Sequence, residues 1–138
     1  PVIYKFSESL AMPIIEKDIY QIVSMAKKYY LTKNYVHVIE LLLNRDLNIL
    51  PEQSRRDLQY LLSDAFYRIG KYKKAKEQVL SLLKQYESDR LYLLLAMIYE
   101  SLDKNNIANQ HYLKLIAQFP NSDYIISAKI KSRILGQH

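Results

Sequence analysis

Residues 92–120, YLLLAMIYESLDKNNIANQHYLKLIAQFP, carry the pattern that decides the fold. An aromatic residue, a leucine and a small residue open this stretch, and an alanine followed four positions later by an aromatic fills its second half: Tyr92, Leu95, Ala96, Ala108 and Tyr112. Spacings of three and four residues place side chains on one face of a helix. The stretch therefore predicts two consecutive helices closed by Pro120, over residues 88–102 and 105–118.

The same register recurs twice upstream. A shift of 33 residues gives Ser63, Phe66, Gly70 and Ala75. A further shift of 37 residues gives Ala26, Tyr29, Asn34, Val38 and Leu42, with Pro51 closing the unit. A pattern that survives three times indicates an internal repeat, which favours a stacked helical architecture.

This arrangement of aromatic, leucine, small residue, aromatic, alanine, aromatic and closing proline resembles the tetratricopeptide repeat family. The resemblance implies an all-α fold, an α-solenoid of about three helix-turn-helix units plus a C-terminal capping helix. The small residues would let paired helices approach closely: Ala26, Ser63, Ala75, Ala96 and Ala108. Large residues such as Tyr29, Phe66 and Tyr112 would fill the space between units.

The predicted organisation is an N-terminal arm or end of a preceding segment over residues 1–15, followed by the repeat domain over 16–138. We expect units at about 16–51, 53–87 and 88–120 and a cap at 122–135, with Pro13 stopping any helix in the arm and Ser122 as the N-cap of the last helix. The expected helices are 16–31, 34–45, 53–69, 72–86, 88–102, 105–118 and 122–135. Since the chain begins at Pro1 without Met, we expect an excised or processed fragment whose signal or anchor would precede it.

Composition excludes several classes of protein. There are two glycines and four prolines among 138 residues, too few for a many-stranded β protein, and no cysteine for disulfides or thiolate metal sites. The longest apolar run falls short of a membrane span. The net charge of +6 mildly favours an acidic partner.

No catalytic constellation is recognisable in the sequence. His37 and Glu40 form the one metal-like spacing, and we interpret them as a solvated helix face, because helical metal sites need several converging ligands. Two glycines cannot build a phosphate-binding loop. We therefore predict a protein that is not an enzyme and that has no cofactor and no metal.

The family resemblance implies a concave groove, lined by the first helix of each unit, that holds an extended peptide or a helix of a partner protein. Stepping around those helices gives the predicted partner-binding residues, which mix aromatics with charged residues and Met: Tyr20, Lys27, Tyr30, Tyr60, Asp64, Tyr67, Arg68, Arg90 and Met97. The predicted function is a protein–protein interaction scaffold or adaptor.

Two alternative functions stay open. The basic stretch Arg68, Lys71, Lys73, Lys74 and Lys76 could contact nucleic acid or anionic lipid, although we favour a solvated helix face. A self-association domain is the other alternative, because terminal repeat helices can form homo-oligomers. We expect nucleic acid not to be the ligand, and a membrane to be reached only through a missing N-terminal anchor.

The linker Phe119-Pro120-Asn121-Ser122 resembles linkers of bacterial envelope repeat proteins, including outer-membrane assembly lipoproteins. The resemblance implies a bacterial, envelope-associated complex on the periplasmic side, with the cytoplasm as the alternative compartment.

Overall fold

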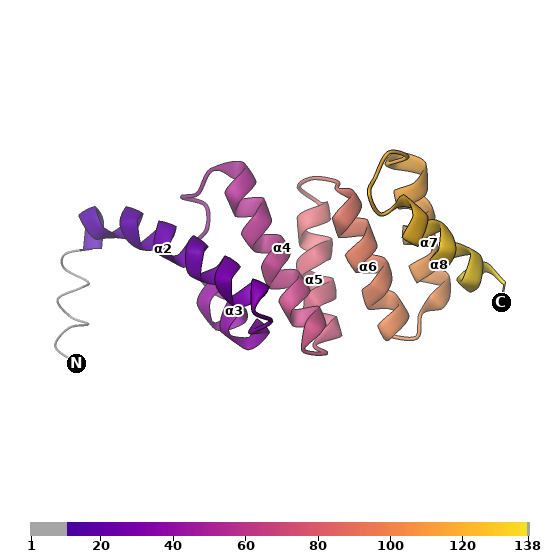
Figure 1. Ribbon diagram of the computed structural model, residues 1–138, viewed down its shortest axis with the longest axis horizontal. Coiled ribbons are helices and arrows are strands. Elements are labelled where there is room, and N and C mark those ends of the chain that lie inside the picture. Colours follow the sequence, from indigo (N-terminus) through magenta and orange to yellow (C-terminus); the bar gives the residue numbers. More distant parts are fainter. Residues whose placement is uncertain (1–10, 138) are drawn as a thin grey trace. The chain divides into compact units, whose positions relative to one another are not determined.

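A computed structural model describes residues 11–137 of the chain, and in that part it contains helices and no strand. The helices are α2 (Ala11–Leu31), α3 (Tyr35–Leu42), α4 (Glu52–Arg68), α5 (Tyr72–Leu83), α6 (Asp89–Ser101), α7 (Asn105–Gln118) and α8 (Ile125–Gly136) (Figure 1). The expected all-α helical-repeat architecture is confirmed.

The chain divides into two compact units between Leu62 and Ser63, inside α4. In the first unit, α2 packs against α3. In the second, α5 packs against α6, α6 against α7, and α7 against α8, so the last four helices form one continuous stack.

The same type of turn joins α2 to α3, α4 to α5 and α6 to α7, and this recurrence shows the repeat in the backbone. Lys33, Gly70 and Asp103 lie at its centre with φ values of 63°, 83° and 59°. The following residue donates its N–H to a carbonyl five positions back, which closes the end of the preceding helix: Asn34 to Tyr29, Lys71 to Phe66 and Lys104 to Tyr99, at 2.8, 2.9 and 2.9 Å. From 33 to 70 is 37 residues and from 70 to 103 is 33, so the turns confirm the register predicted from the side chains.

Every small residue predicted to sit at a helix crossing is fully buried: Ala26, Ser63, Ala75, Ala96 and Ala108. Of the large residues predicted to fill the space between units, Phe66, Leu42 and Tyr112 are also buried, whereas Tyr29 and Tyr99 remain partly exposed. In the second unit the core of the last three helices combines Tyr92 and Ala96 of α6, Tyr112 of α7 and Ala128 of α8. The prediction that small residues occupy the buried positions of the paired helices is thus confirmed.

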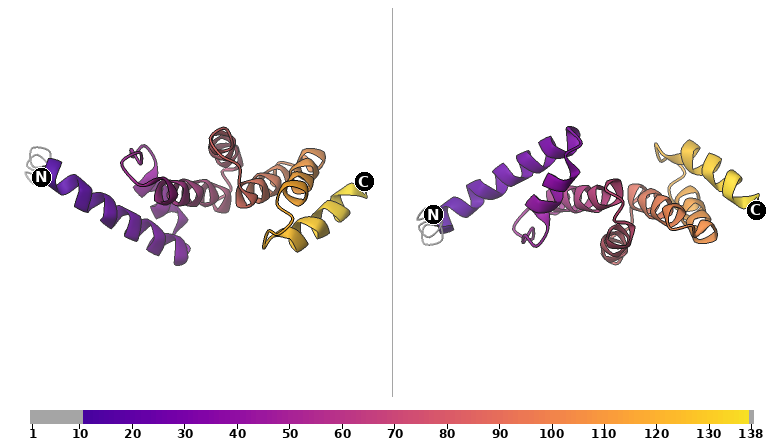
Figure 2. Two further views of the ribbon diagram at one scale, coloured as in Figure 1. Left: turned by 90° about the horizontal axis from the view of Figure 1, so that it is seen from above. Right: turned by 90° about the horizontal axis from the view of Figure 1, so that it is seen from below.

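Four helices, α2, α3, α5 and α8, have one end that lies three or more residues from the predicted one; that of α5 is Leu83 instead of residue 86. Helix α2, indigo in Figure 2, begins at Ala11. Pro13 lies in its first turn, where a proline is tolerated because the first N–H groups of a helix have no partner within it. The prediction that Pro13 stops any helix was therefore wrong, and the expected arm overlaps α2 at residues 11–15. Residues 1–10 of that arm lie outside the described part of the chain.

Helix α3 ends at Leu42 instead of residue 45, because Leu43 is extended and Asn44 has a φ of 66°. Near the C-terminus, Ser122 does not act as the N-cap of α8, since that helix begins at Ile125. Its Oγ instead accepts the Tyr124 N–H at 3.0 Å and donates to Asp89 Oδ2 at 2.6 Å, which anchors the linker to the start of α6.

Candidate functional site

A cavity of about 450 Å³ opens in the second unit. Its wall comes from four helices and combines apolar and polar side chains: Tyr67 of α4, Leu93, Met97, Glu100 and Ser101 of α6, Tyr112 of α7, and Ser127 and Lys131 of α8. The α6 residues recur at spacings of three and four, so one face of α6 forms the centre of the wall. Of the two α6 residues predicted to bind a partner, Met97 lies in this wall and Arg90 does not.

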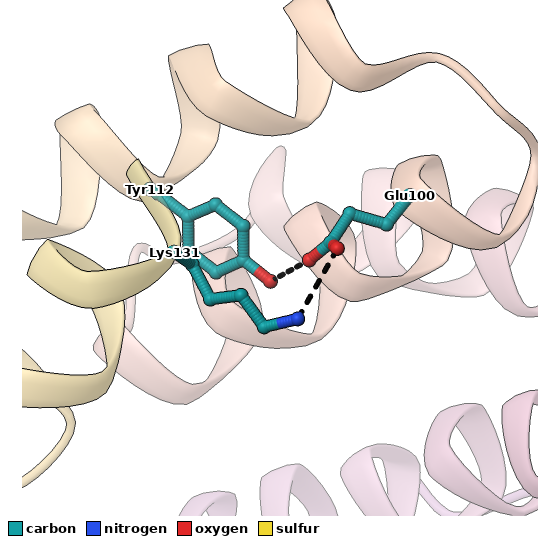
Figure 3. Close-up of polar contacts among 3 residues, drawn as sticks. All are labelled: Glu100, Tyr112 and Lys131. Atoms are coloured by element: carbon teal, nitrogen blue, oxygen red, sulfur yellow. Dashed lines mark hydrogen bonds and ion pairs between the residues drawn. The ribbon is translucent and has the colours of Figure 1, made fainter. Parts of the chain in front are cut away.

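Three polar side chains of the wall, each from a different helix, interact with one another: Glu100, Tyr112 and Lys131 (Figure 3). The Tyr112 hydroxyl donates a hydrogen bond to Glu100 Oε1, and Lys131 Nζ lies 3.3 Å from Glu100 Oε2. Burial, followed by this hydrogen bond to Glu100, raises the pKa of Tyr112, so its hydroxyl stays protonated and remains a donor. Glu100 thus ties α6 to α7 and α8 at the cavity, and its charge is balanced by Lys131.

Tyr67, Leu93 and Met97 form the apolar part of the wall, and all three are half-buried. The ring of Tyr67 packs against Tyr72 across the turn, with centroids 5.7 Å apart. Tyr30 and Tyr35 make the equivalent pair in the first unit at 5.9 Å. Aromatic, methionine and aliphatic side chains that remain partly exposed are the residue types that anchor protein partners.

The predicted partner-binding residues fall into separate groups. Tyr67 and Met97 line the cavity together. Asp64 is 2% exposed and forms an ion pair with Arg68, whose Nε lies 3.3 Å from Asp64 Oδ2, so Asp64 belongs to the interior and Arg68 lies at its edge. Arg90 is half-buried on α6 and is not part of the cavity wall.

The remaining predicted residues belong to the first unit, where Tyr20 and Lys27 are exposed and Tyr30 and Tyr60 are half-buried. Sequence reasoning missed Ser101, Tyr112, Ser127 and Lys131 as wall residues. Tyr112 was assigned to the space between units, and it is indeed buried, but its hydroxyl reaches the cavity. No sequence signal marks Ser127 or Lys131, because the face of α8 that reaches the cavity is set by the packing of α8 on α7.

Part of the basic stretch is held against aromatic rings. Lys74 Nζ lies 5.9 Å from the ring centre of Phe66, and Lys76 Nζ lies 6.0 Å from that of Tyr99. A lysine stacked in this way contributes its carbon chain and charge to the fold and keeps its ammonium group near solvent. These contacts support the interpretation of the stretch as a repeat-helix surface.

The two histidines in the described part of the chain are also engaged with aromatic rings. His37 is exposed and stacks on Tyr29 at 5.0 Å between ring centroids. His111 is half-buried between Tyr92 and Tyr99, at 6.3 and 5.4 Å, and burial, followed by the charge of Lys114, lowers its pKa. Among residues 11–137, no three His, Asp or Glu side chains gather in an arrangement that could hold a metal ion.

Comparison with known proteins identifies one repeat. Residues 90–122, which span α6, α7 and the linker to Ser122, match the tetratricopeptide repeat family model. Repeats of this family generally mediate protein–protein interactions and are non-enzymatic scaffolds. No curated protein and no solved structure matches the chain. Within the described residues, no helix has both the length and the apolar character needed to cross a bilayer.

Proposed function

We propose that this chain is an interaction module that binds a partner protein in the cavity of its second unit. The observation that carries the proposal is the cavity wall, in which the apolar side chains of Tyr67, Leu93 and Met97 occur together with the hydrogen-bonded Tyr112 and Glu100. Its size lies within the range of about 300–1,000 Å³ that is typical of ligand sites. The matched tetratricopeptide repeat supplies α6 and α7, so the helices of a known interaction fold form most of this wall.

The chemistry of the wall favours an apolar or aromatic side chain of an extended peptide or a helix. Glu100 is occupied by Tyr112 and Lys131, so the carboxylate presents little unbalanced negative charge. Lys131 has further N–H donors that could meet a main-chain carbonyl of the partner. An apolar anchor with one polar contact at its edge is the usual composition of an energetic centre in a protein interface.

The test uses the chain as bait in a pull-down from the source cell, followed by affinity measurements on the captured protein. Tyr67→Ala should weaken binding by at least about 2 kcal/mol, or about thirtyfold, because a central aromatic anchor is lost. Ser101→Trp should weaken it as well, since Ser101 is exposed and a large ring there would fill the cavity without altering the core.

The control is the double change Lys73→Glu with Lys74→Glu, which reverses charge in the basic stretch outside the cavity wall. It should leave the affinity nearly unchanged. If it abolished binding while Tyr67→Ala and Ser101→Trp bound normally, the basic stretch would be the binding surface and the cavity proposal would fail. Circular dichroism of each variant separates lost binding from lost folding.

We infer further that the partner belongs to a complex of the bacterial envelope. The support is the Phe119–Ser122 linker, which resembles linkers of envelope repeat proteins. Fractionation of the source cell with an antibody against this chain is the measurement. Recovery with the periplasmic or membrane fractions is expected, and recovery with the cytoplasmic fraction alone would contradict the inference.

A further inference from the structure

Helix α8 carries a row of exposed isoleucines. Ile126, Ile130 and Ile134 are 70%, 55% and 50% exposed, and they follow one another at intervals of four residues. Residues at this interval form a ridge along a helix, the feature that packs into the groove of a second helix. None of the three lines the cavity described above.

The ridge lies on the side of α8 that faces away from α7. Helix α8 packs against α7 (Figure 1). Ala128, which is fully buried, and Ser132, whose Oγ donates to Asn109 Oδ1 at 2.7 Å, lie on the packed face. Each residue turns an α-helix by about 100°, so Ile130 lies about 200° around the helix from Ala128. Within the described residues, α8 therefore buries one face and presents isoleucines on the opposite one.

The charges beside the ridge have one sign. Helix α8 contains Lys129, Lys131 and Arg133 and no acidic residue. Lys131 is paired with Glu100, whereas Lys129 and Arg133 are exposed and form no ion pair among residues 11–137. By helical geometry both lie along one edge of the isoleucine ridge. The surface is thus an apolar ridge with an unbalanced basic edge.

The geometry points to a second docking surface on α8, the ridge Ile126, Ile130 and Ile134, that receives an acidic amphipathic helix of a partner protein. The ridge supplies apolar packing, and Lys129 and Arg133 supply attraction for acidic residues flanking the partner's apolar stripe. A second copy of this chain would place the same cations opposite one another, which costs free energy. An anionic membrane would call for a wider apolar face with aromatic residues, and this ridge is narrow and purely aliphatic.

The experiment uses two synthetic helical peptides with the same leucine stripe, one flanked by Glu and the other by Lys. Fluorescence anisotropy measures their binding to the full chain. The acidic peptide should bind at least about tenfold more tightly than the basic one, with an advantage that shrinks as salt is raised. Ile130→Ser should weaken the acidic peptide by about tenfold or more, because one buried isoleucine is lost from the contact.

Leu113→Ser is the matched control, because Leu113 is a similarly exposed aliphatic residue on α7, and it should leave binding unchanged. Lys129→Glu with Arg133→Glu should reverse the preference between the two peptides. Equal binding of both peptides, or an Ile130→Ser variant that binds like the wild type, would overturn the proposal. So would sedimentation showing a dimer that Ile130→Ser dissociates, or tighter binding to phosphatidylserine vesicles than to the acidic peptide.

Discussion

Three residues at the centres of the turns show how a backbone requirement overrides residue type. Lys33, Gly70 and Asp103 occupy the same left-handed conformation, yet only one is glycine. A residue with a side chain is strained there, by roughly 1–2 kcal/mol for most types and less for Asp. The requirement could be predicted at Gly70 from the glycine itself, but at Lys33 and Asp103 it follows only from the repeat register. The first helix of each pair ends with the same left-handed residue, whatever its type, because the same hydrogen bond must form at that helix end.

Asp103→Gly should stabilise the second unit by about 0.5–1 kcal/mol, because glycine adopts this conformation without strain. Gly70→Ala should destabilise it by about 1 kcal/mol. No atom lies within 4 Å of the position of an added Cβ at Gly70, so backbone strain alone would be responsible. Urea denaturation of both variants measures the change in unfolding free energy, and equal stabilities would show that the turn conformation is wrong.

His111 predicts a pH dependence of stability. Burial and the Lys114 charge lower its pKa in the folded chain, and no hydrogen-bond partner reaches its Nδ1 within residues 11–137. The unfolded chain therefore binds the proton first, so stability should fall as the pH drops below about 6.5, the ordinary value for histidine. Thermal melts should show a lower Tm at pH 6.0 than at pH 7.5. Both pH values lie above the ordinary carboxyl pKa of about 4, so protonation of Asp and Glu does not contribute to the difference.

His111→Phe keeps a ring between Tyr92 and Tyr99 but cannot titrate, so it should flatten this dependence. His37→Gln removes an exposed histidine and serves as the control. A melting profile that stays equally steep in His111→Phe would assign the pH dependence to another group.

At the scale of single helices, the sequence predicts which helices exist and in which order better than it predicts the residues at which each helix begins and ends. All seven predicted helices occur, because spacings of three and four residues persist along each one. Pro13 is compatible with the first turn of α2, the backbone at Asn44 turns away after α3, and Ser122 forms a turn before α8, and the residue type alone does not select these conformations. The boundaries therefore moved, while the buried positions such as Ala96 stayed where the register placed them.

Ala96→Leu and Ala108→Leu should each destabilise the chain by about 1–3 kcal/mol, because both alanines are fully buried in the core between α6, α7 and α8. Ser81→Leu, at an exposed position of α5, is the control and should change stability little. Thermal or urea melts give the comparison. Unchanged stability in both alanine variants would contradict the assigned helix crossing.

At the scale of the whole molecule, the candidate site was only partly predictable. The sequence placed Tyr67 and Met97 on the groove side, because the family resemblance implies a groove along the first helices and helix periodicity selects the residues that face it, and both line the cavity. It also placed Asp64 there, but Asp64 is 2% exposed and forms an ion pair with Arg68 at the edge of the interior, a burial that depends on the packing of the helices and not on periodicity. The Glu100–Tyr112–Lys131 cluster joins residues from three helices, so it emerges only when those helices are packed.

Tyr72 illustrates the same limit. Its position at the start of α5 suggests a purely structural role in the turn, separate from binding. In the folded chain its ring packs on Tyr67, so removing Tyr72 would also disturb the cavity wall. Ser101 is the better probe of the cavity, since its side chain is exposed and touches the space directly.

Site-specific photo-crosslinking tests the central claim most directly. A small aliphatic diazirine amino acid, which has no ring to fill the cavity, replaces Ser101 in the cavity wall or, as the control, exposed Leu113 of α7, which lies outside that wall. Each variant is irradiated in the source cell, and the products are separated by mass. Binding in the cavity predicts one discrete crosslinked protein from position 101, weakened by the added change Tyr67→Ala, and none from position 113. The same product from position 113, with none from position 101, would contradict the account.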